Sequence, residues 1–270
     1  MPPTTRWAVG LEYDGTAYAG WQTQETAPSI QSACERAFSA VADHPVALTC
    51  AGRTDAGVHA IAQVAHFDTL AARTARSWVF GANTHLAADM SALWAVAVPE
   101  RFHARYSALW RTYRYVILSR STRPAIDHRR VCWIHAPLDA ERMAAAAAAL
   151  IGEHDFSAFR AAECQSRTPI RRVESIDVRR VGAYVTIEIR ANAFLHHMVR
   201  NIAGVLIQIG SGEAAVGWAK EVLEGRDRRH GGVTAPPSGL YLVGVSYPAE
   251  YGLPDGAASG AGRPSIMIQT

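Results

Sequence analysis

One short segment, C-A-G-R-T-D-A-G-V-H at residues 50–59, combines residues that could do chemistry with residues that shape a loop. Arg53 and Asp55 stand two positions apart, close enough for a charge-assisted hydrogen bond. Such a bond favours the ionised carboxylate and would point it outward from a rigid loop as a nucleophile. The glycines on either side permit backbone angles that other residues rarely adopt. The alternative is that D-A-G is an ordinary turn.

Arginine is concentrated in the middle of the chain, although the net charge is only +3. Residues 101–130 carry eight arginines and a single acid, Asp127. Aromatic residues are interleaved with these arginines: Tyr106, Trp110, Tyr113 and Tyr115. A second basic cluster consists of Arg160, Arg167, Arg171, Arg172, Arg179 and Arg180. Because guanidinium groups suit phosphates and stack on bases, this pattern is typical of an RNA-binding surface. The alternative is a basic face that is merely solvated.

The sequence lacks the motifs of common cofactor-dependent enzymes. No G-x-G-x-x-G follows a strand, and no Walker loop, H-E-x-x-H or G-x-S-x-G occurs. His196 and His197 are adjacent on a predicted helix, so their side chains should diverge by about 100° and not share a metal. The cysteines form no C-x-x-C pair and are expected to be buried, reduced thiols: Cys34, Cys50, Cys132 and Cys164. We therefore expect an enzyme that needs no metal and no nucleotide or redox cofactor.

Hydrophobic spacing places the segment at residues 50–59 between two strands of an α+β unit. Alternation over residues 7–14 predicts a half-buried strand, and apolar residues at helical spacing after Ser29 predict a capped helix. The expected elements of this first half are strands at 7–14, 46–50, 61–68 and 92–98 and helices at 30–41 and 74–83. Their order, β-α-β-β-α-β, is the split βαβ arrangement.

The second half repeats this order of elements without repeating the sequence. Its expected elements are strands at 112–119, 173–180, 184–191 and 240–247 and helices at 139–150, 195–209 and 214–224. The prediction is an α+β protein of two split βαβ (ferredoxin-like) halves with mostly antiparallel sheets. The expected domains are residues 1–106 and 107–250. A flexible tail at 251–270, rich in Gly, Ala, Ser and Pro, is expected to follow.

Composition bounds the class of protein. Hydrophobic residues make up 49% and charged residues 19% of the 270 residues, which is enough to bury a sizeable core. No apolar run approaches the roughly 18 residues that a membrane span requires. The first residues, MPPTTRW, do not resemble a signal peptide. The expectation is a cytoplasmic protein without a membrane partner.

The string GRTDAGVH, residues 52–59, resembles the signature of the tRNA pseudouridine synthase A (TruA) family. Further segments resemble that family in the same order: LEYDGTAYAGWQ, FHARYSA, RTYRYVI, CQSRTPIR, NAFLHHMVRNIAG and GLYLVGV. The resemblance runs from about residue 7 to residue 251. It implies the pseudouridine synthase fold, a homodimer, and isomerisation of uridine to pseudouridine at positions 38, 39 and 40 of the tRNA anticodon arm. This isomerisation adds and removes no atoms or electrons, in keeping with the missing cofactor motifs.

The resemblance also implies roles for individual residues. Asp55 matches the catalytic aspartate, Tyr113 the active-site tyrosine that stacks on the base, and Arg53 the arginine that pairs with the aspartate. Arg200 is expected to pair with an acid of the catalytic site or to contact a phosphate. The segments that match RNA contacts supply Phe102, His103, Ala104, Arg105, Tyr106, Glu163, Cys164, Gln165, Ser166 and Arg167. Base flipping is assigned to Arg53, Arg73 and Arg105.

Two questions stay open at the level of sequence. Asp55 could attack C1′ of the ribose, add to C6 of the base, or remove the C2′ proton. Ser121 stands where some relatives have a basic flipping residue, and Arg120 or Arg123 could substitute for it.

Two other functions compete with an RNA-modifying enzyme. Split βαβ units with aromatic and basic faces also occur in non-catalytic RNA-binding modules, but no RNP-type string lies on a predicted strand. In a purely structural protein, Arg53 and Asp55 would form a surface ion pair that contributes under about 1 kcal/mol, and Asp55→Ala would be silent.

Overall fold

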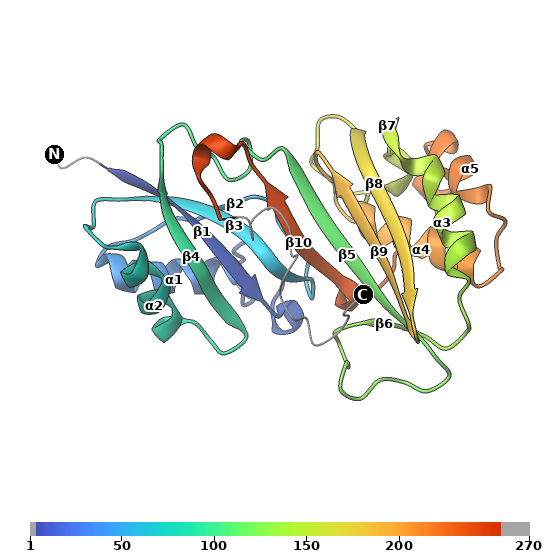
Figure 1. The fold of residues 1–270 in the computed structure, drawn as a ribbon, viewed down its shortest axis with the longest axis horizontal. Coiled ribbons are helices and arrows are strands. Elements are labelled where there is room, and N and C mark those ends of the chain that lie inside the picture. The colour runs from blue at the N-terminus through green and yellow to red at the C-terminus, as the bar shows by residue number, and fades with distance from the viewer. Residues whose placement is uncertain (1–3, 255–270) are drawn as a thin grey trace. The chain divides into compact units, whose positions relative to one another are not determined.

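Alternating apolar residues in the N-terminal half form a sheet, and two helices cover one of its faces (Figure 1). The computed structural model describes residues 4–254. It divides them into two compact units, the first made of residues 4–111 with 241–254 and the second of residues 112–240. Both units mix strands and helices, as the predicted α+β class requires.

The sheet of the first unit has the strand order β4-β1-β3-β10, with β2 paired to β3. Its strands are β1 (Thr5–Tyr13), β2 (Thr49–Cys50), β3 (His59–Thr69), β4 (Met90–Val98) and β10 (Leu240–Ser246). β1 pairs antiparallel with β3 and β4, and β2 pairs antiparallel with β3. β10 pairs with β3 in parallel, with Tyr241 opposite His59. The first unit therefore has a mostly antiparallel sheet.

Two capped helices, α1 (Ile30–Ala42) and α2 (Ala75–His85), pack on this sheet. The Ser29 and Thr74 side chains accept the first free amides of these helices, as expected of N-cap residues. Aromatic side chains fill the space between helices and sheet: Trp7, Phe38, Phe67 and Trp78. The Phe67 and Trp78 rings meet edge to face with their centroids 5.0 Å apart. This packing fixes β3, and β3 in turn fixes the end of the loop at residues 51–58.

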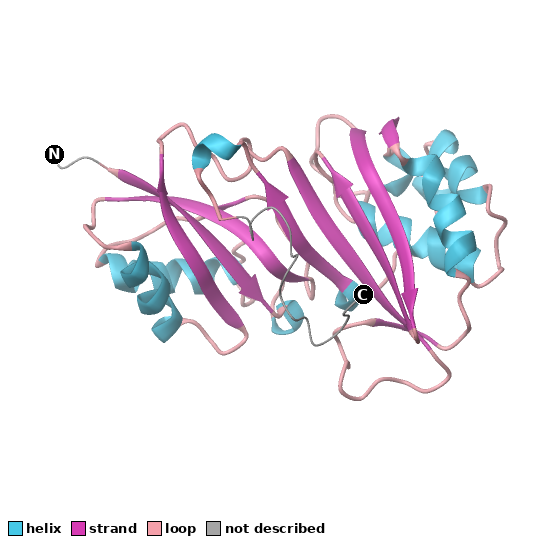
Figure 2. Cartoon of the chain, viewed as in Figure 1, coloured by secondary structure: helices cyan, strands magenta, loops and turns pink. Residues whose placement is uncertain are grey.

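The sheet of the second unit has the order β5-β9-β8-β7, with β6 beside β5. Its strands are β5 (Trp110–Ser119), β6 (Cys132–Ile134), β7 (Gly152–Asp155), β8 (Ile170–Val181) and β9 (Tyr184–Ala191). Helices α3 (Ala140–Ala147), α4 (Met198–Gly210) and α5 (Trp218–Gly225) pack together with it (Figure 2). α4 is almost entirely buried, so it forms the centre of this unit's core.

The C-terminal segment does not belong to the domain that the sequence predicted for it. The expected second domain was residues 107–250, but the second unit ends at residue 240. Residues 241–254 belong to the first unit, because β10 pairs with β3 and the segment after it packs near Phe102. The Phe102 ring lies 5.2 Å from that of Tyr247 and 5.0 Å from that of Tyr251. Tyr251, the first residue of the expected tail, is thus packed. Residues 255–270 lie outside the described part of the chain.

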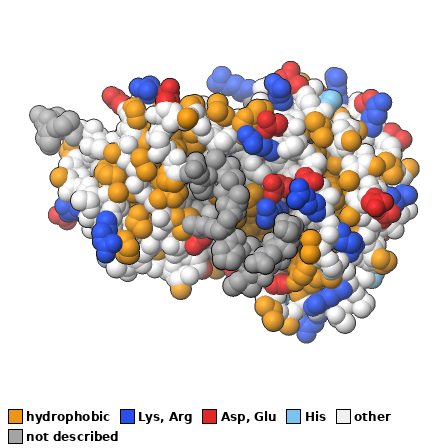
Figure 3. All heavy atoms as spheres, in the orientation of Figure 1, with side chains coloured by type: hydrophobic (Ala, Val, Ile, Leu, Met, Phe, Trp, Pro, Cys, Tyr) orange, Lys and Arg blue, Asp and Glu red, His pale blue; other side chains and the backbone are white. Residues whose placement is uncertain are grey.

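Arginines on the second unit's sheet are interspersed with acids rather than gathered in one uninterrupted basic surface. The ion pairs are Arg114–Glu188 at 2.7 Å, Arg179–Asp177 at 2.5 Å, and Arg190–Glu174. Figure 3 shows basic and acidic side chains mixed on the face in view. Ion pairs near the surface add little stability. Their consequence is that Arg114 of the first arginine-rich stretch and Arg179 of the second cluster are already neutralised.

Between residues 4 and 254, none of the helices combines the length and apolar character needed to cross a bilayer.

Candidate active site

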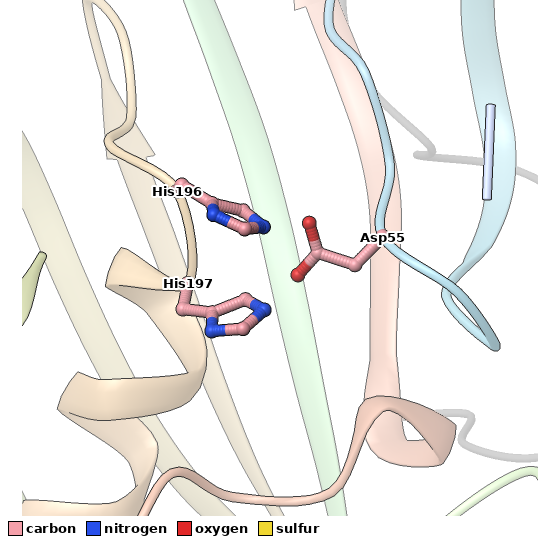
Figure 4. A group of neighbouring side chains, drawn as sticks. All are labelled: Asp55, His196 and His197. Atoms are coloured by element: carbon pink, nitrogen blue, oxygen red, sulfur yellow. The ribbon is translucent and has the colours of Figure 1, made fainter. Parts of the chain in front are cut away.

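Asp55 lies in the first unit, on the loop that joins β2 to β3 (Figure 4). Exposure alternates along this loop, because Arg53 is exposed, Thr54 is 6% exposed and Asp55 is half-buried. The Thr54 side chain is therefore buried, that of Arg53 is exposed, and that of Asp55 is partly exposed. The outward carboxylate and the pairing of Arg53 with Asp55 stay predictions.

Main-chain hydrogen bonds hold the loop on both sides of Asp55. The Trp21 amide donates to the Thr54 carbonyl at 2.9 Å, and the Val58 amide donates to the Asp55 carbonyl at 3.1 Å. Gly20 has a φ of +96°, and a Cβ there would lie only 2.7 Å from the Thr54 carbonyl oxygen. A residue with a side chain would both strain this backbone and push the loop away. The segment at residues 14–21 thus forms the support for the loop.

Arg111 connects the loop to a second segment that the sequence predicts to bind RNA. Its guanidinium donates to the Ala51 carbonyl at 3.0 and 3.2 Å and to the Arg105 carbonyl at 2.5 Å. Arg111 is only 8% exposed. It was missed as a site residue, because the sequence marks it only as one of eight arginines and does not reveal its burial.

The segment at residues 102–106 divides into buried and exposed side chains. Phe102 and Ala104 are 0% exposed, and they fasten the segment to the core rather than present a surface. His103 is half-buried, whereas Arg105 and Tyr106 are exposed, and the Arg105 guanidinium lies 5.7 Å from the centre of the Tyr106 ring. Contacts made by side chains of this segment are therefore left to His103, Arg105 and Tyr106.

His66 anchors this segment through its neutral ring, because its Nδ1 accepts the Ala104 amide at 3.1 Å. Burial, together with the charges of His103 and Arg6, lowers the pKa of His66 to about 4. The unfolded chain therefore takes up this proton before the folded protein does as the pH falls. We expect the free energy of unfolding to fall by roughly 2 kcal/mol as the pH is lowered from about 6.5 to about 4. Above about pH 6.5, His66 should not affect the free energy of unfolding.

Denaturant unfolding at a series of pH values measures this decline. His66→Asn keeps an acceptor for the Ala104 amide but has no proton to gain, so it should flatten the curve in that range. An unchanged curve for the variant would show that His66 is not the group responsible.

Tyr113 lies in the second unit on β5, with its side chain 7% exposed. Its ring meets Phe194 edge to face, with centroids 5.0 Å apart at 84°. Phe194 was not singled out from the sequence, although it lies in the same NAFLHHMVRNIAG segment as Arg200. This contact holds the tyrosine ring in one orientation.

The expectation that the His196 and His197 side chains diverge by about 100° is wrong. α4 begins at Met198, so both histidines precede the helix, and His197 has a φ of 62°. This left-handed turn brings the two rings together, with centroids 4.0 Å apart (Figure 4). Helical spacing does not apply to them, because an adjacent pair diverges in this way only inside a regular helix.

Arg200 is half-buried in the first turn of α4, and its Nε donates to the Ala235 carbonyl at 2.8 Å. The Arg200 carbonyl in turn accepts the Ala235 amide at 3.1 Å. This two-way link fixes the arginine stem against the segment that precedes β10. The predicted pairing of Arg200 with a catalytic-site acid stays a prediction.

The segment at residues 163–167 lies beside the two histidines, since the Cys164 thiol accepts the His196 amide at 3.4 Å. Glu163, Gln165 and Arg167 are exposed, whereas Cys164 is 8% exposed and Ser166 is half-buried. Glu163, Gln165 and Arg167 are therefore the side chains of this segment that can meet a ligand.

All four cysteines are buried and unpaired, as predicted. Burial raises the pKa of Cys34 and of Cys50 to about 12, so these thiols stay protonated. At Cys164, burial acts to raise the pKa, but this effect is outweighed by hydrogen bonds from the His196 and Ser166 amides and by the charge of Arg160, which act to lower it. The pKa of Cys164 is consequently below its ordinary value.

Arg171 is a structural residue, although its charge cluster suggests a phosphate contact. It is 8% exposed, and its guanidinium donates to the carbonyls of Thr168 and Ile170 and to the Ser166 hydroxyl at 2.5–2.9 Å. Burial lowers its pKa from the ordinary value. Its donors organise the loop that displays Arg167.

The arginines proposed for base flipping occupy different surroundings. Arg73 is exposed and donates to the Val41 carbonyl at 3.0 Å, in the last turn of α1. Near Ser121, Arg120 donates to the carbonyls of Thr122 and Arg123 at 2.9 and 3.3 Å. Arg120 thus stiffens its own loop, and the substitution of Arg120 or Arg123 for the family's basic residue stays a prediction.

Comparison with known proteins covers both units. The sequence model of a family described as tRNA pseudouridine synthase matches residues 11–107 and 146–248. The tRNA pseudouridine synthase A of Coxiella burnetii (strain Dugway 5J108-111) is 60% identical over 249 residues, 92% of this chain and 95% of that protein. The enzymes of that name from Methylococcus capsulatus and Pseudomonas aeruginosa are 60% and 54% identical, covering 92% and 93% of this chain and 92% and 88% of their own. The chain belongs to the tRNA pseudouridine synthase family.

Proposed function

We propose that this protein isomerises uridine to pseudouridine in tRNA, at positions 38, 39 and 40 of the anticodon arm. Membership of the family supports the reaction and the substrate, and the resemblance of the motifs supports the positions. The observation that carries the proposal is Asp55 itself, a partly exposed carboxylate on a loop held by main-chain hydrogen bonds on both sides. A rigid, aimed carboxylate is what covalent or general-base catalysis requires.

The reaction breaks the N1–C1′ bond, turns the uracil and forms a C5–C1′ bond. The proton on C5 is released, and N1 ends with a proton, so atoms and electrons balance without a cofactor. Asp55 serves this sequence by attacking C1′, by adding to C6 or by removing the C2′ proton. The Tyr113 ring, held by Phe194, is suited to stack on the base, and its hydroxyl is the candidate acceptor of the C5 proton.

The test is a pseudouridine assay on tRNA transcripts that carry no modifications. The proposed enzyme produces pseudouridine at positions 38–40 wherever these are uridines. A non-catalytic RNA-binding protein would retain these tRNAs and leave their uridines unchanged, and that outcome would refute the proposal.

Substitution of Arg167, which is exposed, should affect tRNA binding, whereas substitution of Arg171, which is buried, should affect stability. Arg167→Ala removes an exposed charge, so it should weaken binding of all substrate tRNAs alike and lower the log–log salt slope by about one. Arg171→Ala should leave that slope nearly unchanged. It should instead destabilise the fold by about 2 kcal/mol, because Ser166 and two carbonyls lose their buried donor.

Binding isotherms at several salt concentrations, together with thermal unfolding of each variant, separate the two effects. A reduced salt slope for Arg171→Ala without loss of stability would contradict the structural role of Arg171.

The proposed assembly is a homodimer that binds one tRNA across both subunits. Sedimentation of the protein should then give about twice the chain mass of 29.2 kDa. A fully active monomer would contradict it. A cytoplasmic location also stays a prediction.

A further inference from the structure

A chain of buried polar side chains lies beneath the Asp55 loop in the first unit. Gln63 is 0% exposed, Tyr13 4% and Thr54 6%. The Gln63 amide nitrogen donates to the Gly52 carbonyl at 2.8 Å and to the Tyr13 hydroxyl at 3.2 Å. The Tyr13 hydroxyl and the Thr54 hydroxyl lie 2.9 Å apart. Two points of the loop, at Gly52 and at Thr54, are thereby fastened to β3 and β1.

Gln63 donates to the Tyr13 oxygen, and in the bond between the Tyr13 and Thr54 hydroxyls either oxygen can be the donor. Loss of either hydroxyl removes the bond that ties the Thr54 side chain to β1. Apolar residues could fill the same space with no hydrogen bonds to satisfy. These polar residues are therefore better explained by the loop positions that they fix than by the stability that they add.

What it holds is the residue immediately before Asp55. The Thr54 hydroxyl is fixed from below by Tyr13, and the Thr54 carbonyl is fixed by the Trp21 amide at 2.9 Å. The side chain and the main chain of Thr54 are both fixed, and this restrains the backbone from which the Asp55 side chain extends. Asp55 itself is half-buried, whereas Thr54 is buried.

We propose that the chain Gln63–Tyr13–Thr54 is a positioning device that sets the aim of the Asp55 carboxylate. These three are positioning residues, since they act through Asp55 and are themselves buried away from any substrate. The inference rests on the proposed function and adds to it the residues that orient the reacting group. A misplacement of about 1 Å can cost about 100-fold in rate while substrate binding persists.

Thr54→Val tests the proposal, because valine keeps the shape of threonine and removes only the hydroxyl. We expect its single-turnover rate of pseudouridine formation to fall about 10- to 100-fold, with tRNA affinity changed less than about twofold. Thr54→Ser restores the hydroxyl and should recover most of the rate. Tyr13→Phe removes the other end of the same bond and should cause a similar loss. The double variant Tyr13→Phe/Thr54→Val should lose little more rate than either single variant, because both substitutions remove the same hydrogen bond.

Thr69→Val is the matched control. Thr69 is a 2% exposed threonine in the same unit, and its hydroxyl makes a part-buried hydrogen bond with His44 Nε2 at 2.8 Å and accepts the Ala71 amide at 3.0 Å. It lies at the far end of β3 from the Asp55 loop. This variant should lose a similar amount of stability and keep the wild-type rate.

Three results would overturn the inference. The first is a wild type that forms pseudouridine and a Thr54→Val variant that forms it at the same single-turnover rate. Another is an equal rate loss in Thr69→Val, and the third is a loss that lies in tRNA affinity rather than rate. If Thr54→Val does not fold, a folded Tyr13→Phe variant with the wild-type rate would overturn the inference instead. A wild type that forms no pseudouridine would instead remove the proposed function, and this inference with it.

Discussion

Asp55→Asn is expected to abolish pseudouridine formation and leave the fold and tRNA binding largely intact. The asparagine amide has the shape of the carboxylate but neither its charge nor its nucleophilicity. We expect the single-turnover rate to fall by at least about 10⁴-fold, as for other enzymes that lose their reacting group. The main-chain bonds that hold the loop should persist, since they are made by the carbonyls of Thr54 and Asp55, which the substitution keeps.

Asp43→Asn provides the control for this substitution. Asp43 is exposed at the end of α1, with a φ of 59° that asparagine also tolerates. It makes the same chemical change in the same unit, and its activity should equal that of the wild type. Measurable pseudouridine from Asp55→Asn, with enzyme and tRNA at equal concentration, would refute the assignment of Asp55.

Tyr113→Phe is expected to cause the second largest loss, of about 100-fold or more in single-turnover rate. Phenylalanine keeps the ring that meets Phe194, and with it a surface for stacking on a base. Only the hydroxyl is removed, so tRNA affinity should change little. A loss of rate without a loss of affinity would place the hydroxyl in the proton transfer from C5.

Tyr115→Phe is the matched control, two residues along the same strand. The Tyr115 hydroxyl donates to the Pro236 carbonyl at 2.7 Å, and the side chain is 0% exposed. Its removal should cost about 1 kcal/mol of stability and no activity. If Tyr113→Phe retains the wild-type rate, the ring acts as a stacking surface only.

Local patterns were sufficient to predict most elements of the fold. Ser29 and Thr74 cap α1 and α2 where the sequence placed them, because a cap depends on a few neighbouring residues. The partner of β10 could not be predicted, since an apolar strand carries no mark of the sheet that it joins. The short strands β6 and β7 were missed for a related reason, as three or four residues show no clear period.

The candidate site was predictable where residue type decides chemistry and unpredictable where burial decides it. Asp55 and Tyr113 were singled out by motifs, and their catalytic roles stay predictions. The structural roles of Arg111 and Arg171 were hidden, because only the folded chain shows which arginines are buried against carbonyl groups. The turn that brings His196 and His197 together was hidden as well, since a φ of 62° at a residue other than glycine is rarely signalled by sequence.

The most direct test of the central claim measures hydrogen release from C5 of the target uridines. Formation of the C5–C1′ bond displaces this hydrogen into water, so tRNA transcripts labelled with tritium at uridine C5 report each isomerisation. We predict release by the wild type from tRNA with uridine at positions 38, 39 or 40. We predict none by Asp55→Asn, and none from transcripts with cytidine at all three positions. An absence of release by the wild type, or release that persists when those positions carry cytidine, would contradict the proposed isomerisation.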